Sequence, residues 1–136
     1  MTNQKRGSYY FNQVEEEYRQ LQYYLAKCNW NMVIRKSQEV IELLLKGVLK
    51  FMNIEFPKEH DIGEYFEEIL NLRKIEYDKM AMERMKVASK VLTEKRAPAY
   101  YGEVFYSQEE AEEAREQAEF ARKFVKELMK RLEYEE

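Results

Sequence analysis

The sequence is poor in the residue types on which several specialised folds and active sites depend. Its 136 residues include one cysteine, one histidine, four glycines and two prolines. A single cysteine excludes a disulfide scaffold, and the low glycine and proline content excludes collagen and low-complexity linkers. We therefore expect Cys28 to be a buried, reduced thiol.

Long apolar runs and an excess of one charge are also missing. No stretch approaches the 18 or so uninterrupted apolar residues of a membrane span, and the polar segment Met1–Arg6 is not followed by the apolar stretch of a signal peptide. Lys and Arg number 23 against 26 Asp and Glu, a net charge of −3, which is not typical of a non-specific DNA or RNA coat protein. We expect a cytoplasmic, soluble protein that binds neither membranes nor DNA.

The length and the hydrophobic content favour one compact domain. Residues of the hydrophobic types make up 45% of the 136, and a chain of this size buries roughly two-thirds of its unfolded surface. We expect a single domain over residues 1–136, with a flexible N-terminus over residues 1–8.

Apolar residues recur at steps of three and four along most of the chain, which is the spacing of one helix face. This periodicity predicts four long helices, over Tyr9–Lys27, Val33–Met52, Tyr77–Thr93 and from Ser107 to Leu132. A shorter helix is expected to begin at Asp61 and to end within Asn71–Lys74. No alternating strand pattern and no internal repeat is present. The fold class is therefore all-α, an antiparallel up-and-down bundle of four long helices and one short helix.

Helix ends and loops can be assigned from capping residues and from proline. Asp61 with Glu64, and Ser107 with Glu110, have the spacing of a capping box. Pro57 predicts a turn before the short helix, and Pro98 with Gly102 predicts a loop over Arg96–Tyr106. In the last helix a seam of alanines, from Ala111 to Ala121, would let a neighbouring helix approach closely.

Side chains that could perform known catalytic chemistry are scarce. With one histidine and one cysteine the chain has too few of the usual ligands for a zinc site. The Glu-x-x-His pattern of di-iron bundles is also absent, because Pro57 and not Glu lies three residues before His60. No spacing supports a nucleophile and histidine pair, and no glycine-rich phosphate loop precedes a helix. We expect no metal, no cofactor and no catalytic residue of these types.

The first polar cluster worth considering is Pro57–Asp61. His60 lies just before a helix N-terminus, where free backbone amides favour an anion. His60 could contact a ligand or partner there, or it could form a local hydrogen bond that completes the turn.

The second cluster is Lys95–Glu103. Arg96 offers a planar fork for phosphate, and Tyr100 and Tyr101 offer faces on which a base could stack. The loop could therefore hold a nucleotide such as ATP. Alternatively it is a connection in which Arg96 pairs with a carboxylate and the tyrosines close the end of the bundle.

Charged residues also follow the second helix. Arg35 and Lys36 lie a turn from Glu39, and Lys46 lies a turn from Glu42, so these residues can form pairs within the helix. We interpret this face as solvated.

Two segments carry a resemblance to a known family. Arg35–Leu49 followed by Ile54–Ile62, and later Arg96–Gly102 followed by Tyr106–Ala111, resemble the HEPN domain (higher eukaryotes and prokaryotes nucleotide-binding). A second helix rich in Gln and Glu, a Pro-x-x-His-Asp turn and an Arg-x-Pro-Ala-x-Tyr-Gly loop occur in the order typical of that family, over about residues 9–132. The resemblance implies a helical bundle that forms a homodimer or higher oligomer, and often a partner chain of the minimal nucleotidyltransferase type.

The resemblance also implies which catalytic residue to look for. Many HEPN proteins are metal-independent ribonucleases, some of them toxins of toxin–antitoxin pairs, which use an Arg followed, after four to six intervening residues, by a His. Counted from Arg96, those positions hold Tyr101, Gly102 and Glu103, so the histidine is missing, and tyrosine, with a pKa of about 10, is a poor substitute.

We therefore favour a non-catalytic HEPN protein that binds a nucleotide or a partner protein, with Arg96, Tyr100, Tyr101 and His60 as the binding residues. The alternatives are a ribonuclease toxin and a purely structural dimerisation module.

Overall fold

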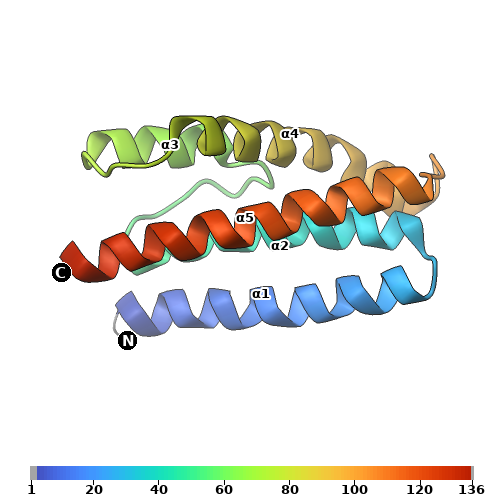
Figure 1. The fold of residues 1–136 in the computed structure, drawn as a ribbon, viewed down its shortest axis with the longest axis horizontal. Helices are drawn as coiled ribbons and strands as arrows, with labels where there is room; N and C mark the ends of the chain where they lie inside the picture. The colour runs from blue at the N-terminus through green and yellow to red at the C-terminus, as the bar shows by residue number, and fades with distance from the viewer. Residues whose placement is uncertain (1–2, 136) are drawn as a thin grey trace.

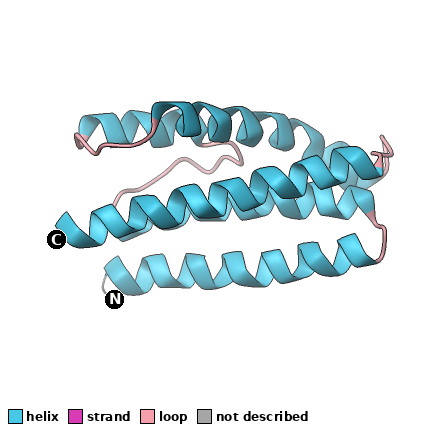
Figure 2. Cartoon of the chain, viewed as in Figure 1, coloured by secondary structure: helices cyan, strands magenta, loops and turns pink. Residues whose placement is uncertain are grey.

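The computed structural model describes residues 3–135 and shows five helices and no strand within them (Figures 1 and 2). The helices are α1 (Asn3–Ala26), α2 (Trp30–Phe51), α3 (Gly63–Leu72), α4 (Lys79–Tyr101) and α5 (Gln108–Glu135). The predicted all-α bundle of four long helices and one short helix is confirmed.

The four long helices alternate in direction, and α2 lies at the centre (Figure 1). α2 packs against α1, α4 and α5, while α3 lies alongside α4. A long connection over residues 52–62 leads from α2 back along the bundle to α3 (Figure 2). Side chains on different faces of α2 therefore meet groups from three other helices.

α2 is central because it has a wide apolar face, which packs against α1, α4 and α5. Twelve of its residues are buried, among them Ile34, Ile41 and Leu45, which are at most 1% exposed. The Asn29 side chain caps the helix by accepting a hydrogen bond from the Met32 amide at 3.3 Å. A helix with so wide an apolar face must pack against several other helices.

The start and end of α1 differ from the prediction. α1 begins at Asn3 rather than at Tyr9, so residues 3–8 of the segment expected to be flexible are helical, and residues 1 and 2 lie outside the described part. Here Gly7 packs closely on Phe51, a contact between distant residues that the local pattern does not reveal. At the other end Cys28 adopts a left-handed conformation (φ 59°) and is exposed, so the prediction of a buried thiol was wrong.

The start of α3 is also different from the prediction. α3 begins at Gly63, and its N-cap residue Ile62 makes no side-chain capping bond. Asp61 instead accepts hydrogen bonds from the Ser89 hydroxyl at 2.7 Å and the Gly63 amide at 3.1 Å, and Glu64 pairs with Lys86. The predicted capping box at Asp61 was wrong because its carboxylate is used to attach the connection to α4.

α4 continues through the segment that was predicted to be a loop. The helix includes Arg96 and Pro98 and ends only at Tyr101, before Gly102 in the left-handed conformation (φ 68°). The Asn31 side chain supports this end, since its amide donates to the carbonyls of Ala99 at 3.0 Å and Val104 at 2.8 Å. Pro98 has no backbone N–H and so removes one hydrogen bond within the helix, but the Asn31 contacts hold the carbonyls beyond the proline and stabilise the helix end.

α5 agrees well with its prediction. The Ser107 hydroxyl accepts from the Glu110 amide at 3.1 Å, as expected at a helix N-terminus. Ala111, Ala114, Ala118 and Ala121 are all buried, at 3% exposure or less. This confirms the seam of small residues.

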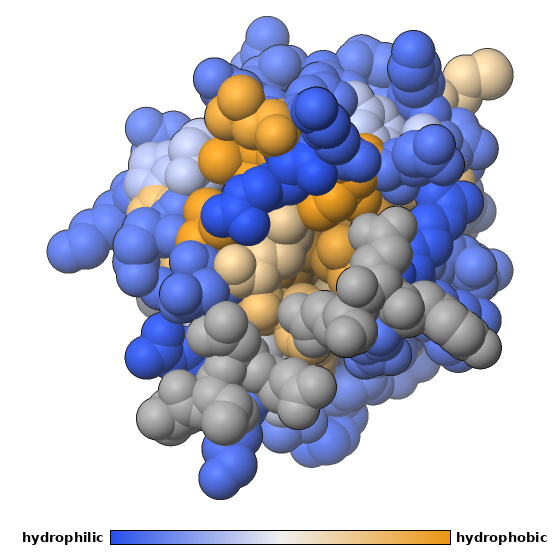
Figure 3. Space-filling model, turned by 90° about the vertical axis from the view of Figure 1, so that its left-hand side faces the viewer, coloured by the Kyte–Doolittle hydropathy of each residue, from blue (hydrophilic) through white to orange (hydrophobic). Residues whose placement is uncertain are grey.

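The end of the bundle that carries the two chain termini combines apolar and polar surface. Figure 3 shows apolar residues gathered near the middle of this end, with hydrophilic residues around them. Leu72, in the last turn of α3, is 71% exposed. Within residues 3–135 no helix combines the length and apolar character needed to cross a membrane.

Candidate functional site

Arg96 lies on α4 and reaches the middle of α2. Its Nη1 donates to Gln38 Oε1 at 2.6 Å and lies 3.8 Å from Glu39 Oε1. The Arg96 side chain is 14% exposed, and burial together with the charge of Arg35 lowers its pKa. Arg96 is thus a partly covered cation whose contacts come from another helix.

Gln38 connects Arg96 to His60. This glutamine is 1% exposed, and its Nε2 donates to Glu42 Oε1 at 2.9 Å and to the His60 carbonyl at 3.3 Å. His60 Nδ1 lies 2.9 Å from the same Glu42 oxygen. Arg96 and His60, which are distant in the sequence, therefore belong to one hydrogen-bonded group, which we call the α2–α4 cluster: Arg35, Lys36, Gln38, Glu39, Glu42, His60, Arg96 and Tyr100.

The predicted tyrosines lie at the edge of this cluster. The guanidinium of Arg35 lies 4.3 Å from the ring centre of Tyr100, which is 55% exposed. Tyr101 is 71% exposed and meets Tyr100 edge to face, with 5.1 Å between ring centres. Arg96, Tyr100 and His60 are thus brought together, and Tyr101 joins them through Tyr100.

The charged face of α2 is not solvated, contrary to the prediction. The side chains of Arg35, Lys36, Glu39 and Glu42 are between 13% and 21% exposed. The predicted pairs within the helix do form, with Arg35 Nε 3.1 Å from Glu39 Oε1 and Lys46 Nζ 2.7 Å from Glu42 Oε2. Residues of α1, α4 and the His60 segment cover this face.

Glu17 of α1 extends the polar contacts across the α1–α2 seam. Lys36 Nζ lies 3.0 Å from Glu17 Oε2 and 3.3 Å from Glu39 Oε2. Burial and a hydrogen bond with Glu39 raise the pKa of Glu17 to about 7. Burial acts in the same direction on Glu39, but Glu17 and Lys36 outweigh it and lower the pKa of Glu39.

The balance of charge around Glu39 favours an anion. Arg35, Lys36 and Arg96 all lie within 4 Å of the Glu39 carboxylate, while Glu17 is partly protonated near pH 7. Positive charge therefore exceeds negative charge at this point, and the nearby Tyr100 ring presents an exposed face. No group of three or more His, Cys, Asp or Glu side chains within the described residues is arranged to hold a metal ion.

Sequence reasoning missed the residue that joins the site. Gln38 falls between Ile34 and Ile41 and before Leu45, at steps of four, three and four, so it occupies an apolar position of α2. A polar side chain at such a position must find hydrogen-bond partners, and this is the signal that could have identified it. Glu17 carries no comparable signal, because its partners lie on another helix.

Comparisons with known proteins agree with the fold. A family model described as "HEPN domain" matches residues 8–128. No curated protein and no solved structure matches the chain. The matched range contains every residue of the α2–α4 cluster.

Proposed function

The chain belongs to the HEPN domain family, and we propose that it is a non-catalytic member that binds a nucleotide at the α2–α4 cluster. The observation that carries this proposal is the pair of guanidinium groups, Arg35 and Arg96, that share the Glu39 carboxylate beside the exposed Tyr100 ring. Arginine suits phosphate, and an exposed aromatic ring suits a base.

Both guanidinium groups keep donors for a ligand. Arg35 contacts Glu39 through Nε, and Arg96 makes both of its polar contacts through Nη1. Their remaining N–H groups have no hydrogen-bond partner among the described residues. A phosphate group that accepts from both arginines would relieve their mutual repulsion, which adds to the effect of burial in lowering the pKa of Arg96.

The residues after Arg96 support a non-catalytic function. The positions at which HEPN ribonucleases carry histidine hold Tyr101, Gly102 and Glu103. Arg96 can hold a phosphate without supplying a proton. A nucleotide-binding protein of this kind would support a separate chain, and family membership makes a minimal nucleotidyltransferase our choice for that partner.

The experiment is a calorimetric titration of the chain with ATP. We expect saturable binding that weakens by about tenfold or more in Arg35→Ala and in Arg96→Ala, since each variant loses a charge-assisted hydrogen bond. Arg84→Ala is the matched control, because Arg84 lies on α4 but contacts Gln117 and the Phe120 ring instead. Circular dichroism checks that each variant is folded. Absence of heat with the unmodified chain would refute the nucleotide site.

A ribonuclease is the second candidate, and the raised pKa of Glu17 favours it. A carboxyl group with a pKa of about 7, connected through Glu39 to Arg96, could exchange a proton near neutral pH. Incubation of RNA with the chain without added metal tests this. Cleavage that is lost in Glu17→Gln would replace our proposal by the ribonuclease, whereas intact RNA would leave the non-catalytic function in place.

A further inference from the structure

Two carboxylates from different helices share one lysine at the edge of the α2–α4 cluster. Lys36 Nζ of α2 lies 3.0 Å from Glu17 Oε2 of α1 and 3.3 Å from Glu39 Oε2 of α2. The three side chains are between 13% and 20% exposed. One ammonium group therefore lies between two acidic groups that are largely covered by protein.

Glu39 connects this lysine to the two arginines that we assign to phosphate binding. Its Oε2 faces Lys36, while its Oε1 lies 3.1 Å from Arg35 Nε and 3.8 Å from Arg96 Nη1. Glu17 is not itself a member of the α2–α4 cluster. A change of charge at Glu17 therefore acts on the arginines through one intervening carboxylate.

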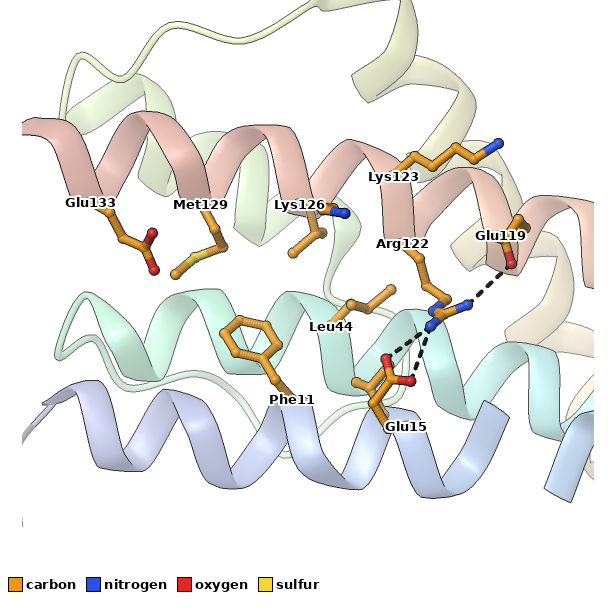
Figure 4. A pocket seen from close by; sticks show the side chains of 11 residues that line it. Phe11, Glu15, Leu44, Glu119, Arg122, Lys123, Lys126, Met129 and Glu133 are labelled. Atoms are coloured by element: carbon orange, nitrogen blue, oxygen red, sulfur yellow. Dashed lines mark hydrogen bonds and ion pairs between the residues drawn. The ribbon is translucent and has the colours of Figure 1, made fainter. Parts of the chain in front are cut away.

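The charges that act on the pKa of Glu17 come from α2, and they are those of Lys36 and Glu39. The acidic residue two positions earlier on α1 is in a different situation. Glu15 is rotated by about 200° around the helix from Glu17 and is paired with Arg122 of α5 at 2.9 Å (Figure 4). Of these two carboxylates of α1, Glu17 is the one whose charge is coupled to the cluster.

The number of ionised carboxylates decides how much positive charge is left for a phosphate. Three cations lie around Glu39, namely Arg35, Lys36 and Arg96. While Glu17 carries a proton, these cations face one ionised carboxylate. Once Glu17 has lost that proton they face two, and Lys36 is then balanced by Glu17. A phosphate therefore meets more positive charge in the protonated state.

The remaining acidic group of the cluster is balanced by its own partner. Glu42 Oε2 lies 2.7 Å from Lys46 Nζ, and its Oε1 accepts from Gln38 and lies 2.9 Å from His60 Nδ1. Imidazoles as a class change charge near neutral pH. An experiment on protons at this site must therefore separate the effect of His60 from that of Glu17.

We propose that nucleotide binding at the α2–α4 cluster is coupled to a proton on Glu17, so that the phosphate binds more tightly while Glu17 is protonated and its arrival makes an ionised Glu17 take up a proton from solvent. This inference rests on the proposed function. The two effects occur together because linkage is reciprocal: a proton that strengthens phosphate binding is itself bound more tightly when the phosphate is present. The pKa of Glu17, about 7, places the effect in the neutral range.

Calorimetric titration with ATP at pH 6 and pH 8 compares the unmodified chain with Glu17→Gln. The Gln side chain is neutral, and its amide can donate to Glu39 as a protonated Glu17 does. Between pH 6 and pH 8 the unmodified chain should lose roughly fivefold more affinity than the variant, because one unit of charge is added at a partly screened distance. ATP is the same in both titrations, so the difference reports the replaced carboxyl group.

Two further variants support this comparison. Glu16→Gln is the matched control, because Glu16 is the adjacent acidic residue, is 45% exposed and pairs with Arg19 instead. It should keep the pH dependence of the unmodified chain. Glu17→Ala is a second neutral variant with a high helix propensity, and it should behave as Glu17→Gln does if circular dichroism shows that the Gln variant is not folded.

Proton uptake is measured by repeating the titration at pH 7 in two buffers of different ionisation heat. The unmodified chain and Glu16→Gln should take up more protons per bound ATP than Glu17→Gln. The uptake per bound ATP should be preserved in His60→Gln, even where the affinity changes.

The outcomes separate the coupling from the nucleotide site itself. Parallel pH profiles, or equal proton uptake in the unmodified chain and Glu17→Gln, would overturn the coupling and leave the nucleotide site in place. Uptake that is lost in His60→Gln and kept in Glu17→Gln would overturn it by assigning the proton to His60. Absence of saturable binding at both pH values would refute the nucleotide site, and the coupling with it.

Discussion

A carboxyl group that is covered by protein and faces a second carboxylate keeps its proton to a higher pH than a solvated one. Glu17 is in this position beside Glu39, and its pKa rises to about 7, while that of Glu39 falls. Lys36 lies between the two carboxylates and contacts both. One proton is therefore shared at the α1–α2 seam in the neutral pH range, next to the cations that we assign to nucleotide binding.

Replacement of Glu17 by Gln should change how stability depends on pH. The folded pKa of Glu17, about 7, exceeds the ordinary value of 4.5, so between these values the folded chain binds more protons than the unfolded chain. Its contribution is full below pH 4.5 and is lost as the pH rises through 7. Between pH 5 and pH 8 the free energy of unfolding should therefore fall further in the unmodified chain than in Glu17→Gln. With allowance for solvent screening, we expect this difference to be roughly 1 kcal/mol.

Urea unfolding at pH 5, 6, 7 and 8 measures this difference. Glu16→Gln is the control, because Glu16 is on the same helix and is more exposed. Parallel pH profiles for the unmodified chain and Glu17→Gln would show that Glu17 does not titrate in this range.

At the scale of the helices, contacts from other elements decide where each helix ends and how closely two helices pack. Asn31 of α2 supports the last turn of α4 in spite of Pro98, and Asp61 attaches the connection before α3 to Ser89. The crossing of α1 and α2 depends on glycine, since Gly47 leaves room for the Phe11 ring. Gly47 is therefore needed for close helix packing and not for a turn.

Replacement of Gly47 by Ala should therefore destabilise the protein. Alanine favours a helix over glycine by about 1 kcal/mol, but its Cβ would lie 2.9 Å from Phe11 Cε1 and 3.0 Å from Tyr10 Cβ. Overpacking of this kind costs about 1–3 kcal/mol, so we expect a net loss of roughly 1 kcal/mol.

Thermal unfolding followed by circular dichroism checks this. Gly63→Ala is the milder control, because the nearest contact of the added Cβ is Lys86 Cγ at 3.3 Å. A higher melting temperature for Gly47→Ala would mean that α1 can move away from α2 at little cost.

At the scale of the whole molecule, a further exposed surface adjoins the α2–α4 cluster at the corner between α4 and α5. At this corner Tyr101, Val104 and Phe105 are 71%, 44% and 85% exposed. Large exposed apolar groups that lie together are typical of protein interfaces.

We expect the corner to form the contact of a homodimer. Phe105→Ser removes the most exposed aromatic ring, and loss of an aromatic anchor commonly costs 2 kcal/mol or more, so dimer affinity should fall about thirtyfold or more. Sedimentation over a wide concentration range measures this, with Met80→Ser as a control of equal exposure. A monomer at every concentration would exclude both this interface and a purely structural dimerisation module.

Part of this structure could be predicted from the sequence. The number of helices, the α5 seam and the Ser107 cap all follow from patterns within a few residues, since a helix face repeats every three or four positions. The candidate residues Arg96, Tyr100 and His60 were also identified from their chemistry. The contacts that bring these residues together could not be identified in this way.

The remainder depends on contacts between residues that are far apart in the chain. Gln38 meets Arg96 across 58 positions, and Asn31 meets Val104 across 73. Such contacts set the end of α4, the partners of Asp61 and the pKa of Glu17, because they change the solvation and hydrogen bonding of groups whose own neighbours in sequence are unremarkable. Periodicity shows which face of a helix is buried. It does not show which other helix covers that face or which polar groups meet there, because both depend on how the other helices pack around α2.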